Sequence, residues 1–267
     1  MRLKRFFMAF LVLIPILAAG RYQEERTPVA ILRFDNNTGD QRYDNLGRAL
    51  SSMLISDLSV VEEIQLVERE RMEDLLNELK LQQSGYVDPS TAVTVGMIVG
   101  AQYVVTGAFV TVDPEMRLDT RIDRVETSEI VSTAEVTGKR DNFFELEQQL
   151  ADQLVDGMQL VLTEDQRARM KAQQEANRID DLETAVAFSQ ALCFLDYGDY
   201  VEAFDKIQDV QEAAPTSQIV RVTFDLLKDR AGEEAKDRLK DRANDALGGL
   251  LGRRREPRRE ETPRPPC

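Results

Sequence analysis

Apolar and polar positions along residues 27–162 predict strands and helices in turn. A continuous apolar run over 29–34 lies between a proline and a polar turn, which predicts a strand buried on both faces. Apolar residues at helical spacing predict amphipathic helices over 43–61 and 71–85, with a short strand over 64–69 between them. This order is typical of a sheet covered by helices.

A third helix is bounded by residue types that start and stop helices. Asp88 can accept hydrogen bonds from free backbone N–H groups, and Pro89 loses nothing at the first helical position. Gly100 ends the helix before an apolar strand over 101–112. Gly96 lies one turn earlier and would let the helix approach the sheet closely.

Two further strands, over 116–125 and 130–138, follow the strand over 101–112 after tight turns. Charged residues alternate with apolar ones in the first of them, so one face of the sheet contacts solvent. A helix over 143–162 closes this part of the chain. The predicted fold class is α+β, a mixed sheet with an antiparallel meander packed by helices, followed by an all-α helical hairpin region.

Four glycines within residues 81–107 raise the question of a phosphate-binding loop. Such a loop lies between a strand and a helix N-terminus, where free N–H groups and the positive end of the helix dipole meet the anion. Gly100 instead lies between a helix C-terminus and a strand, and Gly85 fits the left-handed cap of the preceding helix. We therefore expect these glycines to cap and pack elements.

The composition argues against an enzyme. The chain of 267 residues has no histidine, which removes imidazole-based nucleophile arrangements and most imidazole metal sites. The turn at 35–40 resembles a calcium loop, but Asp40 and Leu46 replace the glycine and glutamate of an EF-hand. A hydrolase would need a carboxylate pair such as Asp35 and Asp40, whereas aspartates in turns usually act as caps. We expect no catalytic residue, no cofactor and no metal.

Residues 1–20 have a basic start, an apolar centre and small residues at the end, the layout of a cleavable export signal. An uncleaved anchor is the alternative, but the apolar centre is shorter than the roughly 20 residues that a spanning helix needs. We predict cleavage near Gly20. No lipid anchor is predicted, because Arg21 stands where a lipoprotein has cysteine.

The net charge of −14 is unevenly distributed. Residues 1–20 and residues 253–267 each carry +3, which leaves −20 for the body between them. An acidic body repels phosphate backbones, so we expect no nucleic-acid partner. The Pro- and Arg-rich end is predicted to be a solvated tail, and its arginines could contact anionic lipid or cell-wall phosphate.

Two cysteines are present. Cys193 lies in an apolar helical stretch and is interpreted as core packing. Cys267 is the last residue, and an intermolecular disulfide is one option for it. An intramolecular bridge would require the tail to reach a buried thiol.

Three segments resemble the CsgG family of curli-type secretion and assembly components: FDNNTGD (34–40), the stretch from Val67 to Gly107, and RVETSEIVSTAEV (124–136). The same segments resemble outer-membrane activators of cell-wall synthases and the N-terminal domain of TolB. The residues that match the family motifs are Phe34, Asp35, Asn36, Gly39, Glu68, Arg69, Gly85, Asp88, Pro89, Gly96, Gly100, Ala101 and Gly107.

The resemblance implies a periplasmic α+β domain over 27–162 that assembles with other proteins and has no catalytic residues. Members that form the curli pore assemble into rings and insert long β-hairpins. This chain lacks the lipidated cysteine, and its strands from Gln102 to Gly138 are joined by short turns. Ser128 also replaces a glycine common in the family turn. A ring-forming outer-membrane secretion channel subunit is therefore the alternative.

The C-terminal part is predicted to be helical. A linker helix is expected over 163–178, tetratricopeptide-like helices over 179–230, and an amphipathic helix with a tail over 231–267. A single repeat over 191–215 cannot bury its apolar face alone, so it must pack on residues 217–230, on the main domain or on a partner. A plain helical hairpin is the alternative. The predicted interaction residues are Phe194, Tyr197, Tyr200 and Phe204.

These observations predict an exported, non-enzymatic assembly or adaptor protein, periplasmic or associated with the outer membrane. Its partners would be other envelope proteins and further copies of itself. The expected process is outer-membrane secretion or the assembly of curli-type surface fibres.

Overall fold

The computed structural model describes residues 26–78, 88–250 and 267. The strands are β1 (Thr27–Ile31), β2 (Asp35–Asn36), β3 (Ile64–Leu66), β4 (Tyr103–Val112), β5 (Glu115–Arg124) and β6 (Glu129–Lys139). The helices are α1 (Leu46–Leu58), α2 (Arg69–Glu78), α3 (Pro89–Val99), α4 (Phe143–Gly157), α5 (Glu164–Ala176), α6 (Leu182–Asp196), α7 (Tyr200–Ala213) and α8 (Gln218–Leu250). The predicted export signal, Gly85 and the basic tail lie outside these residues.

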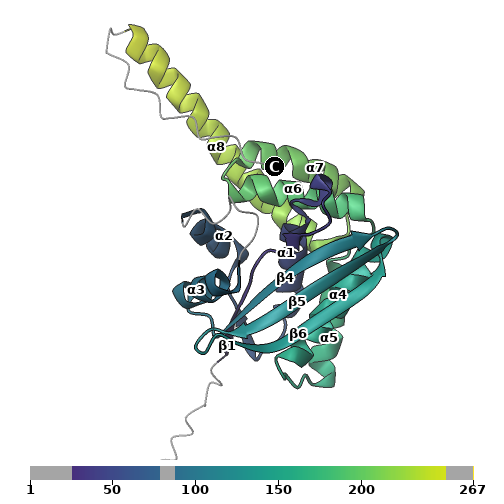
Figure 1. Cartoon of the computed structure of the whole chain (residues 1–267). Coiled ribbons are helices and arrows are strands. Elements are labelled where there is room, and N and C mark those ends of the chain that lie inside the picture. Colours follow the sequence, from purple (N-terminus) through teal and green to yellow (C-terminus); the bar gives the residue numbers. More distant parts are fainter. Residues whose placement is uncertain (1–25, 79–87, 251–266) are drawn as a thin grey trace, which may run out of the picture.

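Six strands of the described chain form one mixed sheet with the order β3-β1-β4-β5-β6, and β2 also pairs with β4. The pairs of β1 with β3 and β4 are parallel, and β4, β5 and β6 form an antiparallel meander. Helices cover the sheet and continue beyond it (Figure 1). The predicted α+β class and the short turns of the meander are confirmed.

β1 is buried on both faces, as its continuous apolar run predicts. Val29 and Ile31 belong to a large core with residues of α1 and α4, whereas Ala30 and Leu32 belong to a smaller core with residues of α2 and α3. Successive side chains of a strand point to opposite faces, so this strand joins the two helical layers.

The third helix starts and stops at the predicted residues. The carboxylate of Asp88 accepts hydrogen bonds from the backbone and hydroxyl groups of Ser90 and Thr91, which lower its pKa to about 2. Gly100 adopts a left-handed conformation with φ of 74°. A Cβ atom on Gly96 would lie 2.7 Å from Cγ2 of Val125, so this glycine allows the close helix–sheet approach that the sequence suggested.

The C-terminal helices share the large core with the sheet. The buried cluster runs without interruption from Val29 in β1 to Phe188 in α6 and Leu227 in α8. α6 packs on α1, and α7 packs between α6 and α8. The repeat-like helices therefore bury their apolar face on both the main domain and residues 218–230, two of the three options that the sequence left open. The boundary predicted between residues 230 and 231 falls inside one helix, because α8 is continuous from Gln218 to Leu250.

A buried acid pair lies where α1, α4 and α5 meet. Asp57 and Glu147 are both 0% exposed, and Asp57 Oδ1 accepts a hydrogen bond of 2.6 Å from Asn177 Nδ2. Burial raises the pKa of Asp57 to about 6. Burial, followed by the charge of Asp57, raises the pKa of Glu147 well above its usual value. The folded state therefore favours protonation of Glu147.

A disulfide links Cys193, near the end of α6, to Cys267, the last residue of the sequence; their Cα atoms lie 5.8 Å apart. Cys193 is buried as predicted, but Cys267 is not available for an intermolecular bond. The intramolecular bridge that the sequence made conditional on Cys267 reaching a buried thiol is therefore present.

No helix in the described part of the chain combines the length and apolarity that a membrane crossing requires. This finding includes the long α8.

Replacing Glu147 with glutamine should make the protein relatively more stable as the pH rises. The unfolded chain loses the Glu147 proton near pH 4.5, whereas the folded chain retains it to higher pH, so wild-type stability falls across that interval. E147Q should therefore be more stable relative to wild type at about pH 8 than at about pH 5. Urea unfolding at both pH values measures the difference. The matched change at the exposed Asp156 of α4, D156N, should show no such gain, and an equal gain in both variants would contradict the assignment.

The disulfide makes a second prediction. Oxidised protein unfolded in denaturant should contain no titratable thiol, and C267S should lose about 2–5 kcal/mol of unfolding free energy. Thiol titration and guanidinium unfolding measure these outcomes. Two free thiols in the oxidised protein, or covalent dimers through Cys267, would show that the link is wrong.

Candidate interaction site

Asp196, the last residue of α6, ties three helices together through two arginines. Arg48 of α1 donates from Nε to Asp196 Oδ2 at 3.0 Å, and Arg69 of α2 donates from Nη1 to Asp196 Oδ1. The side chain of Asp196 is fully buried, and those of Arg48 and Arg69 are 5% and 11% exposed. Two guanidinium groups thus neutralise one carboxylate out of contact with water.

Further charges surround this group. Burial, and then the charge of Arg48, lower the pKa of Arg33, which follows β1 in the chain. Burial, and then the charge of Asp196, raise the pKa of Glu73, which lies on α2. The charges therefore interact as one network, in which every member depends on the position of the others.

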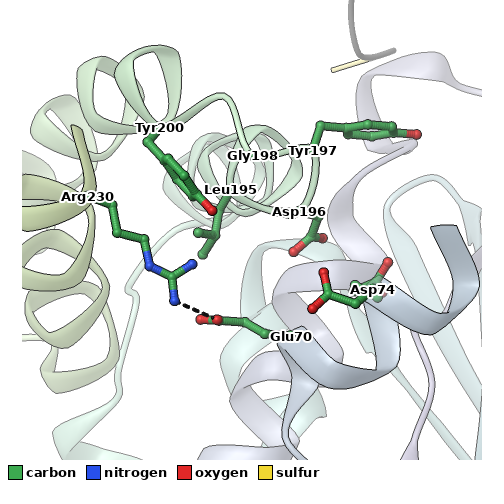
Figure 2. Close-up of a pocket in the computed structure, with 9 residues that line it drawn as sticks. Glu70, Asp74, Leu195, Asp196, Tyr197, Gly198, Tyr200 and Arg230 are labelled. Atoms are coloured by element: carbon green, nitrogen blue, oxygen red, sulfur yellow. Dashed lines mark hydrogen bonds and ion pairs between the residues drawn. The ribbon is translucent and has the colours of Figure 1, made fainter. Parts of the chain in front are cut away.

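A pocket of about 340 Å³ opens beside this network, between α2, the α6–α7 turn and α8. Figure 2 shows Glu70 and Asp74 on the α2 side, Tyr197 and Tyr200 on the opposite side, and Arg230 reaching in from α8. Tyr197 is 37% exposed and Asp74 is also exposed, so the pocket is accessible from solvent.

Arg230 shows which chemistry the pocket accommodates. Its guanidinium lies 5.3 Å from the centre of the Tyr200 ring, and its Nη2 donates to Glu70 Oε2 at 2.9 Å. Aromatic faces and carboxylates are the groups that attract cationic side chains. Asp74 and Tyr197 offer the same two groups elsewhere in the pocket. The arrangement suits the binding of a basic side chain from a partner.

The four predicted interaction residues separate into two pairs. Tyr197 and Tyr200 line the pocket together (Figure 2). Phe194 packs against the large core, and the ring of Phe204 lies 5.4 Å from that of Phe224 in α8. The two phenylalanines thus contribute to helix packing, the two tyrosines line the pocket, and an interaction role stays a prediction for all four.

Phe34 explains why glycine is present at position 107. Phe34 is buried, and a Cβ atom on Gly107 would lie 2.2 Å from its ring. A Cβ atom on Gly47 would lie 1.8 Å from the Phe34 carbonyl oxygen. Both glycines are therefore required by the close approach of Phe34. Nothing in the local sequence around Gly47 marks this long-range contact.

The turn at 35–40 holds itself together by side-chain hydrogen bonds. Asn36 donates to the carbonyl of Asp40 at 2.9 Å, Gly39 adopts φ of 75°, and Asp40 accepts from the backbone N–H of Arg42. Asp40 is also ion-paired with Arg42, while burial raises the pKa of Asp35 to about 6. Asp40 is therefore occupied as a cap, as the sequence predicted, and offers little to a hydrolytic pair.

The remaining family-motif residues are structural in different ways. Glu68 is exposed and its carbonyl accepts the N–H of Met72, whereas Ala101 is buried after α3. Asp88, Pro89, Gly96 and Gly100 shape α3, as described above. Arg69 is the motif residue that contributes directly to the charged network.

The pocket also depends on residues that the sequence analysis missed: Arg48, Glu70, Glu73, Asp74, Asp196 and Arg230. They come from four helices, and charged residues are frequent throughout the chain. No local spacing relates one to another, so no sequence signal was available.

A known family model matches the N-terminal part of the chain. Residues 15–117 match the family model described as curli production assembly/transport component CsgG. The resemblance seen in the sequence is thereby confirmed over this CsgG region. Arg48 and Arg69 lie within it and Asp196 lies outside it, so the charged network joins the CsgG region to the C-terminal helices.

Sequence and structure comparisons add little beyond this match. No curated protein matches the chain. Among solved structures, the LpoB C-terminal domain from Salmonella enterica is 20% identical with a TM-score of 0.36, covering 42% of this chain and 82% of that one. The PelC dodecamer from Paraburkholderia phytofirmans is 15% identical with a TM-score of 0.34, covering 51% and 90%. Lipoprotein GNA1162 from Neisseria meningitidis is 12% identical with a TM-score of 0.36, covering 51% and 99%.

The network predicts a large difference between two neighbouring aspartates. D196N removes the carboxylate that neutralises Arg48 and Arg69, so it should cost about 3–5 kcal/mol of unfolding free energy. D74N changes an exposed residue of the same pocket and should stay within about 0.5 kcal/mol of wild type. Urea unfolding measures both. Equal stability of the two variants would exclude the proposed importance of Asp196.

Proposed function

We propose that this chain is an exported, non-enzymatic envelope protein that acts as an assembly component or adaptor through protein–protein contacts. The match of residues 15–117 to a family described as a curli production assembly/transport component carries this proposal. The match fits a role in the cell envelope, in the periplasm or at the outer membrane. Participation in secretion or in the assembly of curli-type fibres is the specific role that we infer.

The pocket supplies the surface for such contacts. One of its walls is α2 of the CsgG region, and the others are the α6–α7 turn and α8. A partner that presents a lysine or arginine could place it between Asp74 and Tyr197, in the way that Arg230 lies between Glu70 and Tyr200. The binding surface would then combine the CsgG region with helices that lie outside the family match.

The test is site-specific photo-crosslinking in the source organism. A benzophenone amino acid at Tyr197 should form adducts with an envelope protein, because this side chain faces the pocket and solvent. The same group at Val222, an exposed position on α8 that does not line the pocket, is the control. Adducts that are absent, or identical at both positions, would refute the pocket as the binding surface.

Affinity for the identified partner gives a second measurement. Y197A should weaken binding by at least tenfold, since aromatic residues that anchor an interface commonly contribute more than about 1 kcal/mol. V222A should bind like wild type.

A further inference from the structure

β6 forms one edge of the sheet. It pairs with β5 over its length, and no other strand of the described chain lies against its outer side. The strand has 11 residues, long enough to present a row of backbone donors and acceptors. Such an edge is a template for the addition of another strand.

Two hydrogen bonds show which residues of β6 direct their backbone groups outward. The Thr120 hydroxyl of β5 donates to the carbonyl of Ala134 at 3.5 Å, so this carbonyl faces β5. The carbonyl of Glu135 instead accepts from the Gln153 side chain of α4, at 3.3 Å. Backbone groups alternate in an antiparallel strand, so Thr137 and Lys139 also direct theirs outward.

The side chains of the same residues share the face of the sheet opposite to α4. Val136, between them, is buried in the large core with residues of α4. Glu135, Thr137 and Lys139 therefore point to the other face, and all three are exposed. The Glu135 side chain is 60% exposed, and its contact with Arg117 of β5 is long, at 3.9 Å.

We propose that two copies of this chain pair through β6, antiparallel, with Thr137 on the two-fold axis. Glu135 of each copy then lies opposite Lys139 of the second copy, and Thr137 lies opposite Thr137. All three positions have outward backbone groups, and the Glu135 carbonyl can accept a second hydrogen bond beside the one from Gln153, so the pairing forms up to about six backbone hydrogen bonds. Opposite charges and paired threonines directly across two strands are favourable.

The charge pattern identifies a second copy as the occupant. Glu135 and Lys139 lie at equal distances on either side of Thr137 and carry opposite charges. An antiparallel copy centred on Thr137 therefore places each charge opposite its counter-charge, as an isologous two-fold interface requires. Shifting the register by two residues, so that Thr137 lies opposite Glu135, removes both ion pairs. Shifting it by two more places the like charges of Glu135 opposite each other. The proposed register is the one that pairs both charges.

The mass of the mature, oxidised protein over a dilution series tests the pairing. Wild type should be a dimer that dissociates on dilution. E135K and K139E should each shift the dimerisation constant at least tenfold toward monomer, because each places like charges across the axis. The double variant E135K/K139E restores opposite charges and should dimerise like wild type. E129K, the same reversal at the other end of β6, is the control and should not change the equilibrium.

A cross-link tests the register independently of affinity. The cysteine in T137C should form a disulfide between copies, since directly opposed, hydrogen-bonded residues have Cα atoms about 5.5 Å apart. T133C lies on the same face four residues away and should not cross-link. A wild-type monomer at all concentrations, failure of the double reversal to restore the dimer, or equal cross-linking of both cysteine variants would overturn the proposal.

The proposed dimer and the proposed adaptor role can be refuted independently of each other. Tyr197 and Tyr200 lie on the C-terminal helices, and the proposed pairing surface lies on β6. Loss of pairing in E135K would therefore leave photo-crosslinking at Tyr197 unchanged.

Discussion

The carboxylate of Asp196 fixes the position of α6 relative to α1 and α2. It accepts from an arginine of α1 and an arginine of α2, both within the CsgG region, although it belongs to the last turn of α6. Two buried guanidinium groups would be costly without this partner, so the end of α6 must stay against α1 and α2. That position places Tyr197 and Tyr200, the residues that follow, against α2 and thereby forms the pocket.

Other contacts stabilise the same junction by different physical means. The core is continuous from β1 to α8, so apolar burial does not stop at the end of the family match. Asn177, after α5, donates to Asp57 of α1 in a region that excludes water. The disulfide joins the last residue of the chain to α6. The C-terminal helices therefore pack on the rest of the described chain, and α5 packs on α1.

The two proposed interaction surfaces differ in their chemistry. The pocket combines carboxylates with aromatic rings and suits a cationic side chain. The β6 edge offers backbone hydrogen bonds and a self-complementary pair of charges, which suits an identical strand. Since the two surfaces are formed by different elements, one molecule could use both at once, as an assembly component requires.

The sequence by itself determined the local elements, because their signals lie within a few residues of one another. The apolar run of β1, the Asp88–Pro89 start of α3 and the left-handed Gly100 all follow from neighbouring positions. The sequence also carries the resemblance to CsgG. It was enough to predict Tyr197 and Tyr200, at the α6–α7 turn, as interaction residues. Only the tertiary structure decided how Arg48, Arg69 and Asp196 meet, that Cys267 reaches Cys193, and that α8 continues beyond residue 231. These features depend on contacts between residues far apart in the chain, and such contacts leave no periodic or compositional trace in a single sequence.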